Sequence, residues 1–506
     1  MRTPVVKLEK LNIFFDQKQV LHDFSLTIYP GQIVAVVGES GSGKSVGALL
    51  TLGLLDANAQ VSAKTSDLFS RPILEMSPVQ WSELRGKEAA MVFQDPMTSL
   101  HPSIRVGKQL DEVLVRHTES NNKGRKKKIL EAFVEVDLPE PEHTYNKYPH
   151  ELSGGQRQRV VIAMALLLNP KLIIADEPTT ALDKAVESTI LALLKKLVKE
   201  RGCALWLISH DLEVVAKHAD EVLVLFRGNT VEQGPAKDVF ENPKHAYTQG
   251  LLSCRPPKEG RPYPLPVLQD FLDGEAPLEQ EELKVPEATF TLLSIEGLTI
   301  GFKRKNGWRK NIHYVVRDTS ISLKQGETLG LIGPSGSGKS TIGRAIVGLN
   351  KYEYKRWKYS GDPRKIQFIF QDPYSALNGG RRIGWILDQV LRRHRGELSS
   401  QERVLRAQAL LEEVGLQASD LHKKPKAFSG GQRQRIGIAR ALAADPELLI
   451  CDESVSALDV SVQAQVLNLL NRIKKNRGLS MIFISHDPNV VRYMCDRIIK
   501  LEPLKA

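Results

Sequence analysis

The sequence predicts an α/β fold that is built twice along the chain, and three observations support this prediction. The chain has 506 residues, which is too long for one typical domain. The same motifs recur in the same order in both halves, so the chain is a tandem duplication of one module of roughly 250 residues. Short apolar runs precede these motifs, and such runs are typical of strands buried on both faces of a mainly parallel sheet.

The register of the repeats shows where the two modules differ. The recurring motifs are Gly38 to Ser45 with Gly333 to Ser340, Ser153 to Arg159 with Ser429 to Arg435, Asp176-Glu177 with Asp452-Glu453, and Ser209-His210 with Ser485-His486. The copies are 295 residues apart at Lys44 and Lys339 but 277 apart at Gln94 and Gln371. The second module has therefore lost 18 residues between its lysine and its glutamine.

Composition limits the environment of the chain but not its partners. A hydrophobic content of 42% with 25% charged residues is ordinary for a soluble protein. The start of the chain has no secretory apolar region, and the longest apolar run near the motifs, Val161 to Leu168, is too short to span a bilayer, which predicts a cytoplasmic chain. Four scattered cysteines indicate neither disulfides nor zinc. The net charge of +11 suits nucleic acid, an anionic membrane surface or simple solubility.

The first recurring motif predicts a phosphate-binding loop in each module. Both copies fit G-x-x-x-x-G-K-[ST], and each follows an apolar run, Ile33 to Val37 or Thr328 to Ile332, and opens a predicted helix. A single match could be a chance glycine turn, but two matches in register make that reading negligible. We expect the backbone to surround the phosphates, the lysine to neutralise them and the last serine to bind Mg²⁺. The loop residues are Gly38, Glu39, Ser40, Gly41, Ser42, Gly43, Lys44 and Ser45 in the first module, and Gly333, Pro334, Ser335, Gly336, Ser337, Gly338, Lys339, Ser340 and Thr341 in the second.

Acidic residues and a histidine follow later apolar runs, where open α/β sheets bind ligands. We expect Asp176 and Asp452 to hold Mg²⁺ and its water shell. The next residues, Glu177 and Glu453, are placed to orient or deprotonate water, and the alternative is a solvated pair of carboxylates. His210 and His486 are predicted γ-phosphate contacts, because a purely structural histidine is less expected to recur after matched strands.

The Ser-Gly-Gly-Gln motif, which we call the signature motif, opens another predicted helix. It comprises Ser153, Gly154, Gly155 and Gln156 in the first module and Ser429, Gly430, Gly431 and Gln432 in the second. A helix N-terminus suits a phosphate, and a serine there is also an ordinary N-cap.

The combination of these motifs resembles the ATP-binding cassette (ABC) ATPases over nearly the whole chain. The resemblance implies ATP and Mg²⁺ as cofactors, an antiparallel β-subdomain, and a helical subdomain inserted before each signature motif, which the helical spacing of Ile129, Phe133 and Val136 also predicts. It further implies that two modules close face to face, so that each nucleotide lies between one phosphate loop and the opposite signature motif.

Further residue roles come from the resemblance alone. It implies that Gln94 and Gln371 bind Mg²⁺ and sense the membrane partner, and that Asp183 and Asp459 lie in loops between the modules. It also implies that two aromatic residues stack on adenine, for which burial in the core is the alternative. These two residues are Phe15 and Phe302.

Three segments resemble one branch of that family, the ATPase subunits of oligopeptide, dipeptide and nickel importers. They are the glutamine loops, Gln94 to Leu100 and Gln371 to Leu377, and the tail Asn242 to Leu252. The fused arrangement resembles the microcin C/peptide type. The resemblance implies an ATPase on the cytoplasmic face of the inner membrane, peripheral to it, which powers an importer for peptides, peptide-like substrates or nickel and metallophores. Its expected partners are two transmembrane permease subunits and, through the complex, an extracytoplasmic substrate-binding protein.

The alternative function is that of a soluble tandem ABC ATPase that acts on the ribosome or on nucleic acid, which the positive charge favours. Such proteins usually join their modules by a long charged helical linker, and they should lack the importer-like tail. This chain has a proline-rich junction and the tail, so no nucleic acid partner is expected.

We expect three segments: a first module over 1–255, a linker over 256–290, and a second module over 291–506 that is shortened after its phosphate loop and at its C-terminal end. The linker is rich in proline and then in acidic residues, which predicts a semi-rigid segment without a core. Cys254 stands alone after the first module, so no iron–sulfur centre is expected. The basic run from Lys303 to Lys310 is interpreted as a solvated loop, with an anionic-lipid contact as its alternative.

Overall fold

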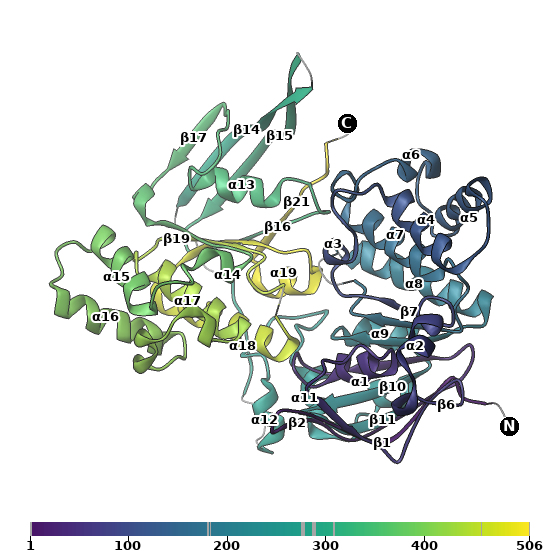
Figure 1. The fold of residues 1–506 in the computed structure, drawn as a ribbon. Helices are drawn as coiled ribbons and strands as arrows, with labels where there is room; N and C mark the ends of the chain where they lie inside the picture. Colours follow the sequence, from purple (N-terminus) through teal and green to yellow (C-terminus); the bar gives the residue numbers. More distant parts are fainter. Residues whose placement is uncertain are drawn as a thin grey trace. The chain divides into compact units, whose positions relative to one another are not determined.

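A computed structural model describes residues 3–504, except 180–181, 183, 275–278, 286–289, 307–308 and 457 (Figure 1). The chain divides into two compact units, Met1–Leu252 and Ser253–Ala506. Each unit is described by itself. Both units have the predicted α/β architecture, in which parallel strands form the core of the sheet.

The core of the first unit is a run of neighbouring parallel strands within a larger sheet. Their order is β10-β3-β9-β8-β7, and each adjacent pair is parallel. The predicted run Ile33 to Val37 forms a strand whose five residues are all buried, as expected for a strand covered on both faces. These strands are β3 (Ile33–Val37), β7 (Ala89–Val92), β8 (Leu172–Asp176), β9 (Ala204–Ser209) and β10 (Glu221–Phe226).

The remaining strands of the first unit form the predicted antiparallel subdomain. β1 (Val6–Phe15) pairs antiparallel with β2 (Lys18–Ile28), and also with β4 (Ala59–Ser62) and β5 (Thr65–Leu68), while β6 (Arg71–Pro72) borders β5. β11 (Asn229–Pro235) pairs with β10 and connects this subdomain to the parallel core.

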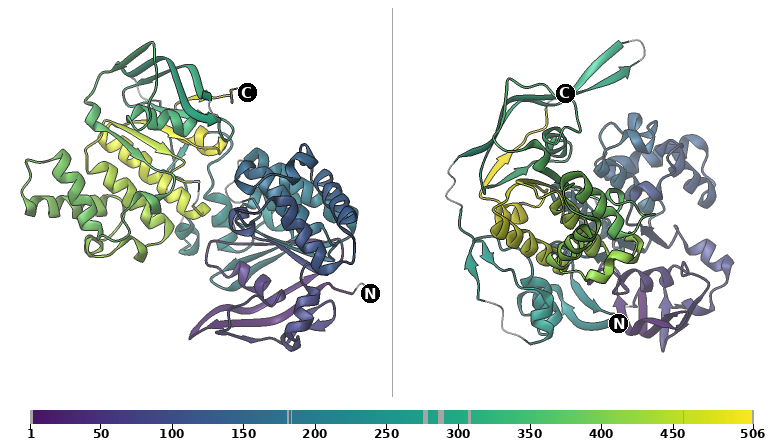
Figure 2. Two further views of the ribbon diagram at one scale, coloured as in Figure 1. Left: turned by 45° about the horizontal axis from the view of Figure 1, so that its top comes forward. Right: turned by 90° about the vertical axis from the view of Figure 1, so that its left-hand side faces the viewer.

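Helices cover the sheet of the first unit and form the inserted subdomain. Ile129 and Phe133 are fully buried there, as their spacing predicts. The inserted helices lie at the opposite end of the unit from β1 and β2 (Figures 1 and 2). The helices are α1 (Lys44–Thr51), α2 (Pro78–Leu84), α3 (Pro96–Ser99), the inserted α4 (Val106–His117), α5 (Asn122–Glu135) and α6 (Pro141–Tyr145), then α7 (Gly154–Leu166), α8 (Lys184–Arg201), α9 (Leu212–His218), α10 (Ala236–Glu241) and α11 (Ala246–Ser253).

The second unit repeats this plan with fewer strands in the part that the structure describes. Its parallel strands are ordered β18-β19-β20-β16-β21, and its antiparallel sheet is β15-β14-β17. Between α13 and β18 only β17 joins that sheet, whereas β4, β5 and β6 occupy the same interval of the first unit. The strands are β14 (Thr291–Asn306), β15 (Arg309–Lys324), β16 (Thr328–Ile332), β17 (Arg356–Tyr359), β18 (Ile366–Ile369), β19 (Leu448–Asp452), β20 (Ser480–Ile484) and β21 (Arg497–Lys500).

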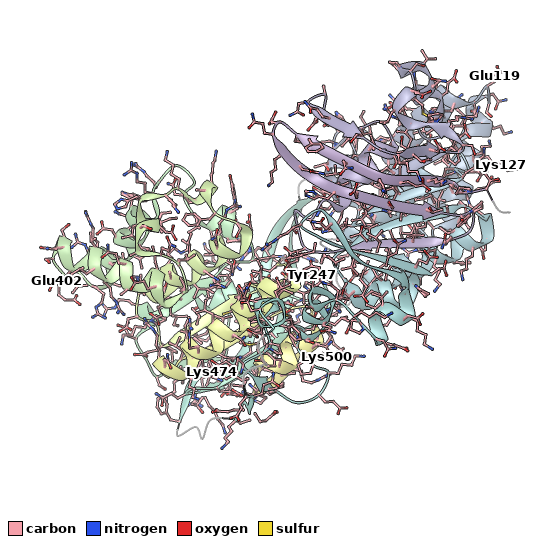
Figure 3. The ribbon with its side chains drawn as sticks, turned by 90° about the horizontal axis from the view of Figure 1, so that it is seen from below. Glu119, Lys127, Tyr247, Glu402, Lys474 and Lys500 are labelled. Atoms are coloured by element: carbon pink, nitrogen blue, oxygen red, sulfur yellow. The ribbon has the colours of Figure 1, made fainter. Side chains whose placement is uncertain are left out.

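The helices of the second unit follow the same order as in the first. They are α13 (Lys339–Ile346), α14 (Pro373–Ala376), the inserted α15 (Ile383–His394) and α16 (Ser400–Glu413), then α17 (Gly430–Leu442), α18 (Val460–Arg477) and α19 (Pro488–Met494). Figure 3 labels Lys127 on α5 and Glu402 on α16, the corresponding inserted helices of the two units. The hairpin β14–β15 carries the basic run 303–310 and projects from the unit (Figure 2), and the side chains of that run lie outside the described residues.

The segment between the modules differs from the coreless linker that its composition predicts. It contains β12 (Pro262–Tyr263), α12 (Leu268–Leu272) and β13 (Glu281–Glu282). Leu265 and Leu268 are buried. Leu265 exchanges two hydrogen bonds of 2.8 Å with the side-chain amide of Asn468 on α18. Proline favours an extended backbone in this segment. Its leucines are buried, and the backbone of Leu265 forms hydrogen bonds with the second unit.

A buried charge cluster fastens the same segment. The Arg261 guanidinium lies 2.8 Å from a carboxylate oxygen of Asp496 and donates to the carbonyl of Tyr493 at 2.8 Å. Lys474, labelled in Figure 3, approaches the other Asp496 oxygen at 2.8 Å. Burial alone would raise the pKa of Asp496, but Lys474 and Arg261 hold it below its ordinary value. The segment is therefore an integral part of the second unit.

No helix in the described part of the chain combines the length and the apolar composition that crossing a bilayer requires.

Replacing Arg261 by alanine should destabilise the second unit. The Asp496 side chain is 1% exposed and would lose one of its two cations, which costs about 2 kcal/mol of unfolding free energy. Denaturant unfolding of the full chain measures this loss. The matched control is Lys475→Ala, because Lys475 and Glu281 form an exposed ion pair between the same segment and α18, and its loss should cost under about 0.5 kcal/mol. Equal effects of the two substitutions would contradict this assignment.

Candidate active site

The predicted phosphate loop of the first unit, Gly38 to Ser45, lies at the junction of β3 and α1. α1 begins at Lys44 after Gly43, whose φ of 98° is left-handed, and no side chain caps this helix. A Cβ at Gly38 would lie 2.2 Å from the Leu225 carbonyl oxygen, so only glycine fits there. Partial positive charge collects at a helix N-terminus, which makes the loop a suitable cradle for an anion.

The phosphate-loop lysines contact their own loops. Lys44 Nζ donates to the carbonyls of Gly38 and Glu39 at 2.8 and 2.9 Å. Lys339 Nζ donates to the corresponding carbonyls of Gly333 and Pro334 at 2.7 and 2.9 Å. Both ammonium groups are therefore held over the loops in which phosphate is expected.

The loop serines and the aspartates meet in both units. Ser45 Oγ donates to Asp176 Oδ1 at 2.9 Å, and Ser340 Oγ donates to Asp452 Oδ1 at 2.7 Å. Burial raises the pKa of both carboxyl groups, which the serine hydrogen bonds partly offset. Asp452 Oδ2 is buried and has no hydrogen-bond partner among the described residues. A hydroxyl and a carboxylate oxygen in this arrangement fit Mg²⁺, which prefers oxygen ligands.

The predicted general base of the first unit lies among the predicted partners. Glu177 directly follows β8 and has a φ of 44°, a conformation that is uncommon for glutamate and is often found at functional sites. Its N–H donates to the carbonyl of Ile208 on β9 at 2.9 Å. Glu177 Oε2 accepts a hydrogen bond from Gln94 Nε2 at 3.0 Å and lies 3.1 Å from His210 Nδ1.

The second unit holds the same three groups with different distances. Glu453, with a φ of 46°, accepts from Gln371 Nε2 at 2.7 Å and lies 3.7 Å from His486 Nδ1. The His486 imidazole is the largest cause that holds the pKa of Glu453 below its ordinary value, and Lys339 and the Gln371 hydrogen bond add to it. The carboxylate is thus kept ionised, as a general base requires.

The signature motifs cap their own helices. Ser153 Oγ accepts from the N–H of Gln156, and Gln156 Oε1 accepts from the N–H of Ser153 at 3.0 Å, which is a capping box. Ser429 and Gln432 form the same box on α17. The ordinary-capping interpretation is therefore correct for both serines, and a phosphate role remains a prediction.

The second glycine of each signature motif is needed for packing. A Cβ at Gly155 would lie 2.7 Å from Val186 Cγ1 on α8, and one at Gly431 would lie 2.2 Å from Val462 Cγ1 on α18. With any larger residue, the facing valine or its helix would have to shift.

The structure places three of the four residues that the resemblance assigns to adenine stacking and to the loops between the modules. Phe15 ends β1 and packs partly against the core, and Phe302 lies on β14 with 44% of its surface exposed. Asp459 precedes α18 as its N-cap residue, and Asp183 lies outside the described residues.

One residue that contacts the phosphate loop was not predicted. Tyr247, labelled in Figure 3, is fully buried on α11, and its hydroxyl accepts a hydrogen bond of 3.0 Å from the N–H of Glu39. Its ring stacks on Phe226 with centroids 4.3 Å apart. The second module has Pro334 at the position of Glu39, and proline has no N–H to donate. That difference, together with the presence of Tyr247 in the importer-like tail, was the available sequence signal.

Comparison with known proteins gives matches over both units. A family model described as ABC transporter matches residues 21–180 and 316–456, and one described as oligopeptide/dipeptide transporter, C-terminal region, matches residues 231–267. The glutathione import ATP-binding protein GsiA of Escherichia coli O6:H1 is 40% identical over 98% of this chain and 84% of its own length. The uncharacterized ABC transporter ATP-binding protein YejF of Escherichia coli K12 is 40% identical over 99% of this chain and 94% of its own length.

Solved structures with two such units share the fold. An RNase-L inhibitor superposes with a TM-score of 0.59 at 20% identity, over 98% of this chain and 90% of the other. An archaeal ribosome recycling factor in complex with a ribosomal stalk protein gives 0.58 at 20% identity, over 95% and 84%. At this identity the likeness concerns the fold alone.

Replacing Tyr247 by phenylalanine should weaken nucleotide binding at the first phosphate loop only. Phenylalanine keeps the stack on Phe226 but leaves the Glu39 N–H without its acceptor, which should raise the dissociation constant roughly fivefold. Titration with a fluorescent ATP analogue measures this dissociation constant. The Lys339→Ala background is used because it impairs binding at the second loop and leaves the first loop intact. The Lys44→Ala background reports on the second loop, where no change is expected. An unchanged first-loop affinity would refute a role for the hydroxyl.

Proposed function

Because the chain belongs to the ABC transporter family, we propose that it is the ATP-hydrolysing subunit of a bacterial importer for peptides or peptide-like substrates. The observation that carries this proposal is the extent of the similarity. The glutathione import ATP-binding protein GsiA matches both units and the segment between them, and the matched C-terminal region of oligopeptide/dipeptide transporters includes Tyr247, which contacts the predicted phosphate loop.

ATP is the nucleotide of this family, and the site residues of both units fit Mg²⁺ as its partner. Ser45, Asp176 and Gln94 would hold the metal in the first unit, and Ser340, Asp452 and Gln371 would hold it in the second. When bound, the metal neutralises negative charge on the β- and γ-phosphates. Burial raises the pKa of both aspartates, and only the ionised carboxylate binds the metal.

The chain's own groups perform the remaining steps. Each lysine exchanges the loop carbonyls for phosphate oxygens when ATP enters. Glu177 and Glu453 then accept a proton from the attacking water. His210 and His486, which lie beside these carboxylates, contact the γ-phosphate and hold its position. Phe15 and Phe302 stack on adenine.

Transport follows from closure of the two modules. Each signature motif completes the site of the opposite phosphate loop, so that two bound ATP molecules draw the modules together and hydrolysis releases them. The glutamine loops face two permease subunits in the membrane, and the chain works from its cytoplasmic face as a peripheral subunit. An extracytoplasmic binding protein delivers the cargo to the complex.

A role at the ribosome or on nucleic acid is not favoured. The similarity to the archaeal ribosome recycling factor is at 20% identity and concerns only the fold, whereas the glutathione import ATP-binding protein GsiA is 40% identical. Purification of the tagged chain from its own cells distinguishes the two. Permeases in the bound fraction, and stimulation of ATP hydrolysis by those permeases, support the importer, while co-purifying RNA or ribosomal proteins would overturn it.

Replacing both glutamates, Glu177→Gln and Glu453→Gln, should trap the closed, ATP-bound state. Glutamine keeps the shape of the side chain but cannot accept the proton, so the hydrolysis rate should fall at least roughly a hundredfold while ATP remains bound. Phosphate release and nucleotide retention on gel filtration measure these effects. Each single variant is the control, and because both units hold the same groups we expect similar partial losses at saturating Mg²⁺. Full turnover by the double variant would be incompatible with the mechanism.

Replacing Ser153 by arginine should impair hydrolysis at the second phosphate loop. An arginine at the start of α7 is larger than serine, and it would occupy the space expected for the γ-phosphate of the nucleotide bound to Gly333 to Ser340. The measurement is ATP hydrolysis in the Glu177→Gln background, where only the second loop turns over. Ser429→Arg in this background is the matched control and should have the smaller effect. The opposite order would refute the crossed pairing.

A further inference from the structure

The two units hold their glutamine loops in different ways. In the second unit, α14 (Pro373–Ala376) begins two residues after Gln371 and lies next to α17, the helix that the signature motif opens. Two arginine side chains of α17 contact this short helix.

The first of these arginines is Arg440. Its Nη1 donates to the carbonyl of Ala376 at 2.6 Å, and its guanidinium lies 5.6 Å from the centroid of the Phe370 ring. Ala376 is the last residue of α14, and the carbonyls at a helix end have no partner within the helix. Burial lowers the pKa of Arg440, so the cation depends on the carbonyl and the ring for its stabilisation.

The second arginine holds the other part of the same helix. Arg433 lies 4.9 Å from the centroid of the Tyr374 ring, and its Nε donates to the carbonyl of Pro425 at 3.0 Å. Residues 433 and 440 are seven apart, which is two helical turns, so both side chains leave the same face of α17. The glutamine loop of the second unit is thus bound to the signature helix at two points.

The first unit has different residues at these positions. Met164 stands at the position of Arg440, and Met97 at that of Tyr374. Arg157, which corresponds to Arg433, donates to the carbonyl of Leu152 at 3.0 Å and to that of Pro149, the counterpart of Pro425, at 3.4 Å. The difference between the two arginines is therefore the ring that Arg433 faces, because the first module has Met97 where the second has Tyr374. Phe93 is 42% exposed, whereas its counterpart Phe370 packs against the core of the second unit.

We propose that Arg440 is a positioning residue for the second site: by tying the glutamine loop to the signature helix, it holds the Gln371 side chain at Glu453, ready to bind Mg²⁺. The Gln371–Glu453 hydrogen bond is 2.7 Å, against 3.0 Å for Gln94–Glu177. A loop that is ordered in advance loses less entropy on binding the metal. The second site therefore requires less Mg²⁺ than the first. The Mg²⁺ part of this inference rests on the proposed function.

The first experiment tests the tie without nucleotide or metal. Amide hydrogen exchange is measured for residues 371–377 in the full chain with Arg440→Met, the residue of the first module. We expect exchange in this segment to become roughly tenfold faster, while residues 94–100 keep their wild-type rate as an internal control. Arg440→Lys keeps a cation that can reach the carbonyl and the ring, and it should stay within about twofold of wild type.

A second variant guards against a general loss of folding. Tyr374 is 48% exposed, so Tyr374→Met should leave the second unit folded, and it should speed exchange of residues 371–377 by a smaller factor of about threefold. Unchanged exchange in both variants would overturn the proposal. So would equally fast exchange in Arg440→Met and Arg440→Lys.

The last experiment measures the consequence for the metal. In the Glu177→Gln background, Arg440→Met should raise the half-saturating Mg²⁺ concentration for ATP hydrolysis about fivefold, with the rate at saturating Mg²⁺ within about twofold of the parent. A fall in the saturated rate alone would contradict a positioning role. If the unsubstituted chain does not hydrolyse ATP, the proposed function fails, and the exchange experiment still decides the role of Arg440.

Discussion

The parallel register of three strands is the constraint on which each module depends. Val37 at the end of β3 lies opposite Ser209 on β9, and Asp176 at the end of β8 lies opposite Ile208. The strands therefore end at the same edge, and the phosphate loop, the acidic pair and the histidine emerge side by side. The five buried residues of β3 and the six of β9 fix this register, because slipping by one residue would break the packing on both faces.

This constraint explains why much of the site could be predicted from the sequence. A short, β-branched run such as Ile33 to Val37 is typical of a strand that is buried on both faces, and the motif that follows such a strand lies at the edge of the sheet. The contacts of Glu177 with Gln94 and His210 then follow from strand order. The duplication strengthened each prediction, because a chance motif does not recur in register.

The remaining features depend on contacts that have no local pattern. Tyr247 reaches Glu39 across 208 residues of sequence, and the aromatic ring at that position has no spacing that points to the phosphate loop. The linker was expected to have no core because its proline content predicts only an extended backbone. It does not predict that the leucines of this segment are buried in the second unit. The serine of the signature motif satisfies both capping and a phosphate role, so its sequence alone cannot separate them. The role of Arg440 can be inferred only by comparison with Met164, its counterpart in the first module.

The attachment of residues 261–268 to the second unit has a consequence for synthesis of the chain. Arg261 leaves the ribosome 235 residues before its partner Asp496, and Leu265 emerges 203 residues before Asn468. Domains fold as units in the order in which they are made. The first unit can therefore be folded before the parts of the second unit that bury this segment have been made. During that interval its leucines are open to chaperones and proteases. The exposure can end only when α18, which carries Asn468, and the segment with Tyr493 and Asp496 have been made.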